Sequence, residues 1–398
     1  MSELLAPAGT LDKLKWAVQY GADAVYFGIQ SFSLRSYAGN FSMDDVNNAM
    51  TYLRKYNKKG YVTLNIYPWS HEYDALLTSA RQLEDIGVDA FIVSDLGVIW
   101  TLKNNGLQTP IHISTQANTL SYQTVLAYAN LGAKRVNLAR ELSLEQIGII
   151  QSQIKNYKIE TEVFIHGAVC FSYSGRCAIS DYLASRKANR GECTHPCRWK
   201  YHLVEEKRPG DYLPVFEDSR GTYLMNTKEL ALFPFVEDLT AMGVHSFKIE
   251  GRMKSIHYVA ATVAFYRQVL DGSPYSEEAG LALLNRISNR GYSYGFMKGS
   301  ITPEDYAISQ RQSTSHAKFV GDVVTQTDDG YIFINVRNTI HAGERLEILM
   351  PSGQLTQMVL PDSLCLSDHT IVKKANHGSY IRLKADVPRY SIFRRVHH

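Results

Sequence analysis

The sequence QYGADAVYFG, residues 19–28, contains the two signals that decide the fold. Gly21 follows an amphipathic stretch and ends a helix, and the apolar run after it is short enough to be a buried strand. The same phrase returns as DIGVDAFIVSD at residues 85–95 and as MGVHSFKIEGR at residues 242–252. Each copy predicts a tight connection that leads from a helix into a strand.

Between these phrases, short apolar runs alternate with longer amphipathic stretches. Seven such strands are complete by Ile165, and the phrase at 242–252 supplies an eighth. Strict alternation over eight strands favours a closed (β/α)8 barrel over an open doubly wound sheet. The first turn, APAGTLDK at residues 6–13, also lacks the glycine-rich phosphate loop that usually opens a doubly wound sheet. We therefore predict an α/β protein with a TIM-like barrel domain over residues 1–270.

The composition is that of an ordinary globular protein. Of the 398 residues, 45% are hydrophobic and 20% are charged, and 42 basic against 39 acidic residues leave a net charge of +3. A nucleic-acid site would therefore have to be a local patch of positive charge. No apolar run approaches the roughly 20 residues of a membrane span, and the N-terminus lacks the pattern of a secretion signal. These features predict a cytoplasmic protein without a membrane partner.

Barrel enzymes carry their chemistry at the C-terminal ends of the strands, so the candidate site residues can be read from the strand pattern. Among the polar residues at these ends, His166, Gln116 and Glu250 are the catalytic candidates. For Ser94, Asp95 and Ser114, capping of the following helix is an equally good interpretation. The polar residues at the strand ends are Asn65, Ser94, Asp95, His112, Ser114, Gln116, Asn137, Arg140, Glu141, His166, Lys248, Glu250 and Arg252.

Between the seventh and eighth strands, an insertion over residues 166–244 contains four of the five cysteines. Cys170, Cys177, Cys193 and Cys197 have the spacing C-x6-C-x15-C-x3-C. The six-residue gap fits zinc poorly, because zinc sites use pairs two to four residues apart, whereas an iron–sulfur cluster accepts thiolates from several loops. The spacing favours a 4Fe-4S cluster, and a structural zinc site or plain buried cysteines are the alternatives.

The end of the chain has a different pattern. Residues 271–312 are predicted to form a helical connector. From residue 313 to residue 398, short alternating strands are joined by Gly, Asp and Asn turns, which predicts a small C-terminal antiparallel β-barrel. Such a domain suits an RNA-binding or interaction module.

Four stretches resemble a known family. EVFIHGAVCFSYSGRCAIS at 162–180 resembles the signature of the U32 peptidase family. GECTHPCRW at 191–199, SRGTYLMNTKEL at 219–230 and FKIEGRMKSIHYVA at 247–260 resemble its branch of prephenate-dependent tRNA uridine 5-hydroxylases. The resemblance extends over nearly the whole chain. It implies oxygen-independent formation of 5-hydroxyuridine at the wobble position, with a 4Fe-4S cluster on the four clustered cysteines.

The resemblance also implies prephenate as co-substrate and the tRNA anticodon stem-loop as partner. Prephenate carries two carboxylates, which guanidinium groups bind through paired hydrogen bonds. The substrate-binding candidates are Arg35, Arg140, Arg252 and Lys248. Cations that alternate with aromatic residues suit a single-stranded RNA loop, and here the RNA-binding candidates are Arg186, Lys187, Arg190, Arg198 and Trp199.

Two alternatives stay open at this stage. The family name implies proteolysis, so a collagenase-like cysteine peptidase is the second hypothesis, although four clustered cysteines suit a single nucleophile poorly. The protein is expected to act on tRNA either alone, as a homo-oligomer or with a paralogue as partner.

Overall fold

The computed structural model describes residues 2–34, 39–170, 172–174, 176–196, 203–204, 212–213, 216–218, 221–223, 227–302, 305 and 314–396. The chain forms two compact units. One comprises Met1–Val18, Ala22–Lys254 and Arg290–Ser313, and the other comprises Gln19–Gly21, Ser255–Asn289 and Thr314–His398. Among the described residues, no helix has the length and apolar character needed to cross a membrane.

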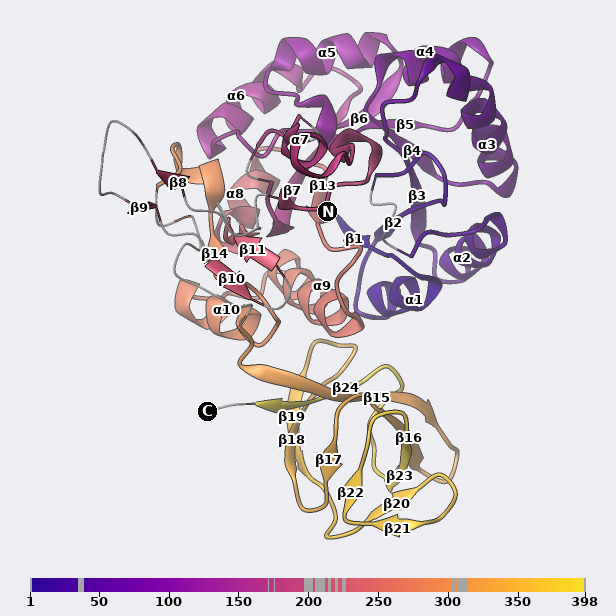
Figure 1. The fold of residues 1–398 in the computed structure, drawn as a ribbon, viewed down its shortest axis with the longest axis vertical. Coiled ribbons are helices and arrows are strands. Elements are labelled where there is room, and N and C mark those ends of the chain that lie inside the picture. The colour runs from indigo at the N-terminus through magenta and orange to yellow at the C-terminus, as the bar shows by residue number, and fades with distance from the viewer. Residues whose placement is uncertain are drawn as a thin grey trace. The chain divides into compact units, whose positions relative to one another are not determined.

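Eight parallel strands form a closed barrel in the first unit, with helices α1 to α6 around it (Figure 1). Each strand pairs with the next from β1 to β7, and β13 closes the ring by pairing with both β7 and β1. The predicted (β/α)8 barrel is confirmed. The strands are β1 (Glu3–Pro7), β2 (Ala24–Gly28), β3 (Lys59–Leu64), β4 (Ala90–Val93), β5 (Ile111–Ile113), β6 (Ala133–Asn137), β7 (Glu160–Ala168) and β13 (Ser246–Ile249).

Local signals start and stop the helices of this unit. Ser42 and Asp45 form a capping box at the start of α2, so that two backbone N–H groups there are satisfied. Gly87 ends α3 with a φ of 83°, the left-handed conformation predicted for this glycine. The helices are α1 (Leu11–Gln19), α2 (Met43–Lys55), α3 (Tyr73–Ile86), α4 (Leu96–Asn104), α5 (Tyr122–Asn130), α6 (Leu144–Ile154), α7 (Ile179–Ala184) and α8 (Val236–Ala241), with the 3-10 turns η1 (Ser70–Glu72), η2 (Thr115–Ala117), η3 (Ala188–Arg190), η5 (Phe233–Phe235) and η6 (Gly295–Lys298).

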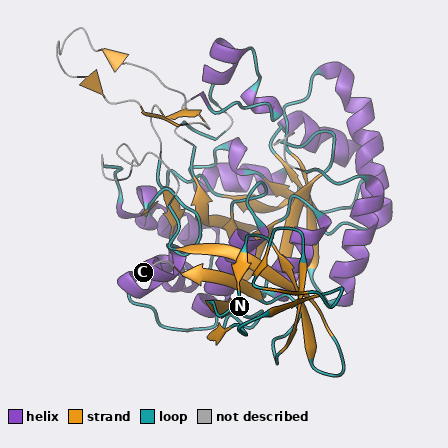
Figure 2. Ribbon diagram, turned by 60° about the horizontal axis from the view of Figure 1, so that its bottom comes forward, coloured by secondary structure: helices purple, strands orange, loops and turns teal. Residues whose placement is uncertain are grey.

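The predicted insertion follows β7, as the cysteine pattern indicated. It contains α7 and several short strands, and Figure 2 shows these strands in orange at the edge of the unit. β12 pairs antiparallel with β7 beyond the ring, and β14 pairs parallel with β12. The additional strands are β8 (Leu203–Val204), β9 (Tyr212–Leu213), β10 (Phe216–Asp218), β11 (Gly221–Tyr223), β12 (Glu229–Ala231) and β14 (Tyr292–Ser293).

The second unit contains α9 (Ile256–Leu270), α10 (Glu277–Leu284) and the predicted antiparallel strands. Eight strands form one antiparallel sheet in the order β19-β18-β24-β15-β16-β23-β20-β21, and β17 pairs with β22. Val320, Ile334 and Phe393 are fully buried members of its hydrophobic core. The strands are β15 (Ala317–Gln326), β16 (Tyr331–Val336), β17 (Ile340–His341), β18 (Arg345–Leu349), β19 (Leu355–Val359), β20 (Leu364–Leu366), β21 (Ile371–Val372), β22 (Lys374–Ala375), β23 (Tyr380–Lys384) and β24 (Ile392–Val396).

The barrel interior contains an apolar cluster that contacts a charged network. Leu5, Tyr26, Tyr61 and Ile92 come from successive strands and pack as one buried cluster.

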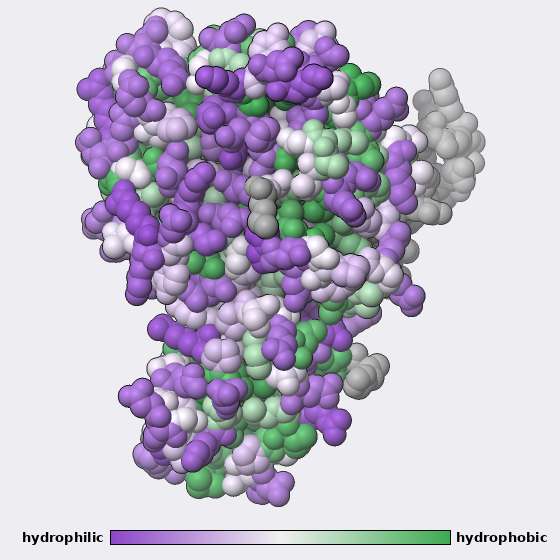
Figure 3. All heavy atoms as spheres, turned by 180° about the vertical axis from the view of Figure 1, so that it is seen from behind, coloured by the Kyte–Doolittle hydropathy of each residue, from purple (hydrophilic) through white to green (hydrophobic). Residues whose placement is uncertain are grey.

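Hydrophilic side chains, purple in Figure 3, are spread over the face shown there, with hydrophobic ones between them. This distribution is typical of a protein whose free energy of folding comes mainly from burying apolar surface inside the barrel.

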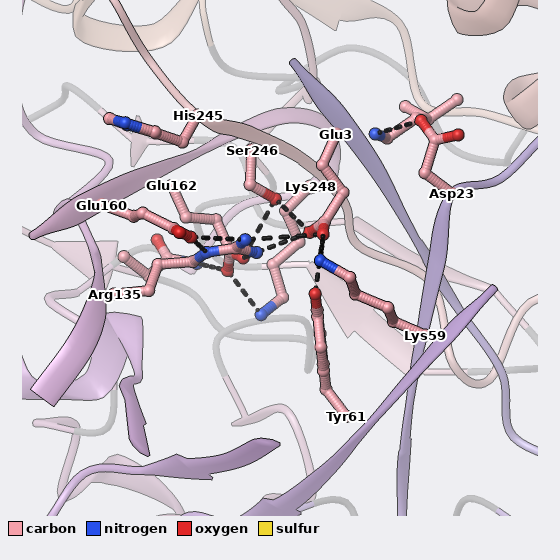
Figure 4. A network of polar contacts seen from close by, with 12 residues as sticks. Glu3, Asp23, Lys59, Tyr61, Arg135, Glu160, Glu162, His245, Ser246 and Lys248 are labelled. Carbon is pink, nitrogen blue, oxygen red and sulfur yellow. Dashed lines mark hydrogen bonds and ion pairs between the residues drawn. The ribbon is translucent and has the colours of Figure 1, made fainter. Parts of the chain in front are cut away.

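Charged side chains fill the remaining part of the interior, where the ring closes (Figure 4). Arg135 on β6 forms ion pairs with Glu3 on β1, at 2.5 Å, and with Glu160 on β7, at 2.8 Å. Glu162 on β7 lies 3.4 Å from Arg135 and 2.8 Å from the ammonium group of Lys248 on β13. The network therefore connects the first strand of the chain to the last three strands of the ring.

The pairing also sets the protonation state of Glu162. Only 2% of this residue is exposed, and burial alone would raise the pKa of its carboxyl group. The positive charges of Lys248 and Arg135 outweigh burial and lower the pKa to about 2. Glu162 is therefore ionised at neutral pH, and its charge is balanced within the barrel.

We expect Arg135→Met to lower the free energy of unfolding of the barrel unit by about 3–5 kcal/mol, because Glu3 and Glu162 would lose their buried guanidinium partner. All four tryptophans fall within the sequence of this unit, so urea unfolding followed by tryptophan fluorescence reports on it. The control is Arg81→Met, which removes an exposed arginine from α3. Equal unfolding midpoints for the two variants would contradict the assigned role of the network.

The pKa of Glu162 predicts a pH dependence. Its pKa is lowered by folding, so its contribution of roughly 3 kcal/mol is present above pH 4.5 and is lost as the pH falls towards 2. The difference in unfolding free energy between the wild type and Glu162→Gln should therefore shrink between pH 6 and pH 2.5. The control is Glu145→Gln, which removes an exposed carboxyl group from α6. A difference for Glu162→Gln that stays constant between pH 6 and pH 2.5 would refute the shift.

Candidate functional site

A cavity of about 140 Å³ lies at the C-terminal ends of the barrel strands, where a TIM barrel binds its substrate. Residues from the strand ends and from the insertion share its wall. Those from the strand ends include Tyr26, Thr63, Asn65, Ser114, Gln116, Arg140, Phe164, Lys248, Glu250 and Arg252, and those from the insertion include Cys170, Cys177, Cys193 and His195. The cavity thus brings together seven of the polar strand-end residues and three of the four clustered cysteines.

Arg140 and Glu250 form one polar group in this wall. The guanidinium of Arg140 donates to the carbonyl oxygen of Ala168 at 2.8 Å and lies 3.9 Å from the ring centre of Phe164. One Glu250 oxygen lies 4.0 Å from Arg140 and accepts a hydrogen bond from Tyr26 Oη at 3.1 Å. The carboxylate is therefore held by two neighbours while its residue lines the cavity.

Arg252 is a buried residue of the wall, and hydrogen bonds hold its guanidinium in place. Only 3% of it is exposed, and its guanidinium donates to the carbonyl oxygen of Leu34 at 3.0 Å and to Asn40 Oδ1 at 2.5 Å. Gly28 makes room for this group, because a Cβ at that position would lie 2.2 Å from Arg252 Nη2. The absence of a side chain at residue 28 is thus a requirement of the site.

Lys248 links the cavity to the charged network below it. Its ammonium group donates to Glu162 at 2.8 Å and lies 4.5 Å from the ring centre of Tyr26. The residue is 4% exposed and lines the cavity. The floor of the cavity therefore carries a positive charge whose position depends on the closure of the barrel.

Gln116 lies in the turn η2, after β5. Its side-chain oxygen Oε1 is 3.3 Å from Asn65 Nδ2 and 3.4 Å from Ser94 Oγ, and it also accepts a hydrogen bond from Ser114 Oγ. The backbone carbonyl of Gln116 accepts from Tyr67 Oη at 2.8 Å. Both ends of this residue are therefore anchored.

His166 does not belong to the lining of this cavity. Only 1% of it is exposed, and its ring lies 5.5 Å from that of Tyr292. Burial, aided by the charge of Lys254, lowers its pKa to about 3, so the imidazole is neutral. The pairing of β7 with β13 skips Ile165, and such a bulge reverses the alternation of side chains that the sequence pattern assumes.

Cys170, Cys177 and Cys193 all line the cavity, while Cys197 lies outside the described residues. Three sulfur donors from different loop positions in one cavity, with cationic residues in the same wall, suit the chemistry of a thiolate-bound iron–sulfur cluster. Within the described parts of the chain, no three Cys, His, Asp or Glu side chains are grouped closely enough to hold a single metal ion. A complete ligand set would need Cys197 or a closer approach of the other three.

Three of the RNA-binding candidates, Arg186, Lys187 and Arg190, are among the described residues. Lys187 is exposed, and its ammonium lies 5.0 Å from the ring centre of Trp69, a residue that is 52% exposed. Arg190 forms a two-point ion pair with Glu72, with distances of 2.5 and 2.9 Å. Arg186 is exposed, and the RNA-binding candidates Arg198 and Trp199 lie outside the described residues, as does the substrate-binding candidate Arg35.

A second cavity, of about 400 Å³, adjoins the first and shares Cys177 and Ala188 with it. Tyr67, Arg176 and Lys187 are in its lining. Sequence reasoning did not select Tyr67 or Trp69 for this surface. The available signal was the aromatic stretch YPWS at 67–70, in the loop that follows β3.

Asp95 has the capping role that was its alternative interpretation. Its carboxylate accepts from the backbone N–H of Val98 at 3.0 Å, at the start of α4. Ser94, His112, Asn137 and Glu141 are likewise outside the lining of the first cavity. The strand ends therefore divide into residues that face the cavity and residues that support the barrel.

Comparison with known proteins agrees with this architecture. The chain is 36% identical over 403 residues to tRNA hydroxylation protein P of Escherichia coli, covering 89% of this chain and 87% of the relative. It is 34% identical to the 23S rRNA 5-hydroxycytidine synthase of the same organism, covering 87% of this chain and 52% of the relative. It is 30% identical to a collagenase of Porphyromonas gingivalis, covering 75% of this chain and 73% of the relative.

Two family models together match most of the sequence. The model of peptidase family U32 matches residues 9–306, which include the barrel strands from β2 to β13 and the cysteine insertion. The model of the peptidase family U32 C-terminal domain matches residues 315–394, the antiparallel strands of the second unit. The order of the two matches is that of the structural elements, and the chain belongs to peptidase family U32.

Proposed function

We propose that this protein is a tRNA hydroxylase that converts the wobble uridine of the anticodon to 5-hydroxyuridine, without O₂ and with prephenate as co-substrate. The observation that carries the proposal is the strand-end cavity, in which three cysteines share a wall with Gln116 and Glu250. The relationship to tRNA hydroxylation protein P, over 89% of this chain, supports tRNA as the substrate.

A 4Fe-4S cluster is the cofactor of this proposal. Cys170, Cys177, Cys193 and Cys197 would hold it, and three of these line the cavity. Such a cluster supplies electron-transfer and Lewis-acid chemistry when bound. The cationic side chains in the same wall favour a negatively charged group there, because opposite charges attract strongly where water is excluded.

The small-molecule site of the proposal uses the cations of the cavity. Arg140, Arg252 and Lys248 line it, and guanidinium and ammonium groups are the natural partners of the two carboxylates of prephenate. Asn40 and Leu34 hold Arg252 in place, so its charge is positioned before any ligand arrives. Arg35 stays a candidate for the same role from the adjoining loop.

The reaction replaces the C5–H bond of uracil by C5–OH, which removes two electrons from the base. Without O₂, either water supplies the oxygen and an acceptor takes the electron pair, or a donor delivers the oxygen atom. In both cases a proton must leave C5. Glu250, held by Tyr26 beside the cavity, is our candidate to accept it, because a positioned carboxylate is a suitable general base.

The surface beside the cavity suits an anticodon loop. Trp69 offers an exposed aromatic face next to the ammonium of Lys187, and Arg176 lines the adjoining cavity. Unpaired bases stack on aromatic rings while cations meet the phosphates, which is how single-stranded RNA is commonly held. Arg190 is already paired with Glu72, so we assign it to positioning this surface.

A collagenase-like cysteine peptidase is the second candidate, and the relative named collagenase favours it. Such a peptidase needs a thiolate with a histidine as its base. His166 is outside the cavity, whereas His195 lines it together with Cys170, Cys177 and Cys193. The hydroxylase is preferred because three clustered cysteines suit a bound cluster better than a single nucleophile.

Deletion of the gene should abolish 5-hydroxyuridine in cellular tRNA, as measured by mass spectrometry of nucleosides, in cells without a paralogue. We expect the wild-type gene and Cys365→Ala to restore the modification and Cys170→Ala to fail, because Cys170 lines the cavity and Cys365 does not. Cys365 is a matched control in β20 of the second unit.

Two results would reject this function. One is an unchanged level of 5-hydroxyuridine in the deletion strain. The other is efficient cleavage of collagen peptides by the purified protein that disappears in Cys170→Ala, which would favour the peptidase.

Anaerobic reconstitution with iron and sulfide should load about four iron atoms per chain and produce a broad thiolate-to-iron absorbance. Serine substitutions at Cys170, Cys177, Cys193 and Cys197 should each reduce both signals, because every thiolate would be a ligand. Cys365→Ser should retain them. Iron uptake that is the same in Cys170→Ser and in the wild type would exclude the assigned ligand set.

A further inference from the structure

The orientation of the Gln116 side chain follows from a chain of hydrogen bonds that starts at the backbone. The N–H of Leu34 donates to Asn65 Oδ1 at 3.0 Å. A backbone N–H can only donate, so the atom facing it is the amide oxygen of Asn65. The amide nitrogen Nδ2 is then the Asn65 atom that lies 3.3 Å from Gln116.

The same reasoning orients the next amide. An amide nitrogen can only donate, so the Gln116 atom that faces Asn65 Nδ2 must be its oxygen, Oε1. Ser114 also directs its hydroxyl group at this oxygen, while Ser94 Oγ lies 3.4 Å from it and 3.2 Å from the backbone carbonyl oxygen of Asn65. Tyr67 Oη and Asn118 Nδ2 hold the backbone carbonyl of Gln116, at 2.8 and 2.9 Å.

With Oε1 occupied, the amide nitrogen Nε2 of Gln116 is the free end of the side chain. It donates to no residue in the described part of the chain, and Gln116 lines the strand-end cavity. The cavity wall therefore presents an N–H donor whose direction is fixed by Asn65. Thr115 adds a hydroxyl that is 6% exposed and has no partner among the described residues.

We propose that Gln116 Nε2 donates to the O4 oxygen of the target base and that this bond selects uridine over cytidine. The inference rests on the proposed function and identifies the residue that reads the base. Uracil carries an acceptor at position 4, whereas cytosine carries an amino group, which would face the amide donor without a bond. A site built to hydrogen-bond one group rejects the analogue that leaves its buried donor unpaired.

Two neighbouring observations support a base carbonyl as the acceptor. The carboxylates of a small molecule are better served by Arg140, Arg252 and Lys248 in the same wall, because charge-assisted hydrogen bonds are stronger than those of a neutral amide. The Thr115 hydroxyl can donate or accept, so it tolerates either base and leaves the choice to Gln116. A relative is named for 5-hydroxycytidine, which makes cytidine the appropriate comparison for uridine.

The test uses the full-length protein and synthetic anticodon stem-loops that carry U or C at the wobble position. We expect the wild type to bind the U loop roughly tenfold more tightly, as measured by fluorescence anisotropy. Gln116→Glu places a carboxylate oxygen towards the cavity and should reverse the preference. Gln82→Glu, an exposed substitution on α3 with the same change of charge, should leave the ratio unchanged.

Asn65→Asp tests the positioning role of Asn65 separately. An aspartate lacks the Nδ2 donor, so the Gln116 amide should turn round and present its oxygen, which lowers the U-to-C ratio at least tenfold. Tryptophan fluorescence verifies that each variant is folded. A role in stability alone would change the unfolding midpoint without changing the U-to-C ratio.

The outcomes separate the inference from the proposed function. An unchanged U-to-C ratio in Gln116→Glu overturns the inference while leaving the hydroxylase proposal intact. Loss of prephenate binding in Gln116→Glu, with an unchanged U-to-C ratio, also overturns the inference. The amide of Gln116 would then bind the small molecule. A wild type that binds neither stem-loop overturns the proposed function, and the inference with it.

Discussion

The ion pairs of Arg135 with Glu3 and Glu162 are the interaction on which the rest of the structure depends (Figure 4). They lie inside the barrel, where β1 meets the last strands of the ring, and they replace apolar packing at that point. Because Glu162 also binds Lys248, the same group that closes the barrel positions a cation at the floor of the cavity. Fold and site therefore share one set of charges, and neither can change without the other.

Because the ring is closed, the C-terminal ends of its strands contribute residues to one cavity. A parallel barrel brings the C-terminal ends of all eight strands to one face, so residues far apart in sequence, such as Asn65 and Glu250, line one cavity. The insertion after β7 adds Cys170, Cys177 and Cys193 to the same wall. This arrangement combines thiols, cations, a carboxylate and an oriented amide around one small volume, and these are the groups to which the proposed hydroxylation assigns roles.

Several elements were predictable because they depend on local patterns. The strand alternation predicted the barrel and the approximate positions of Gln116, Arg140, Lys248, Glu250 and Arg252. The position of His166 was not predictable in this way. The prediction assumes that side chains alternate regularly along a strand. The bulge at Ile165 breaks this alternation, so the ring of His166 lies near Tyr292 and outside the cavity lining. Trp69 joins the surface only because its loop folds beside Lys187, which is distant in sequence.

The sequence by itself determined the order of elements, the closed barrel, the insertion that carries the cysteines and the family, because periodicity and motifs are properties of neighbouring residues. Only the tertiary structure decided which side chains share the cavity, which partner balances each buried charge and which way the Gln116 amide points. These depend on contacts between distant residues, such as Leu34 with Asn65 and Asn65 with Gln116, whose geometry no local pattern specifies.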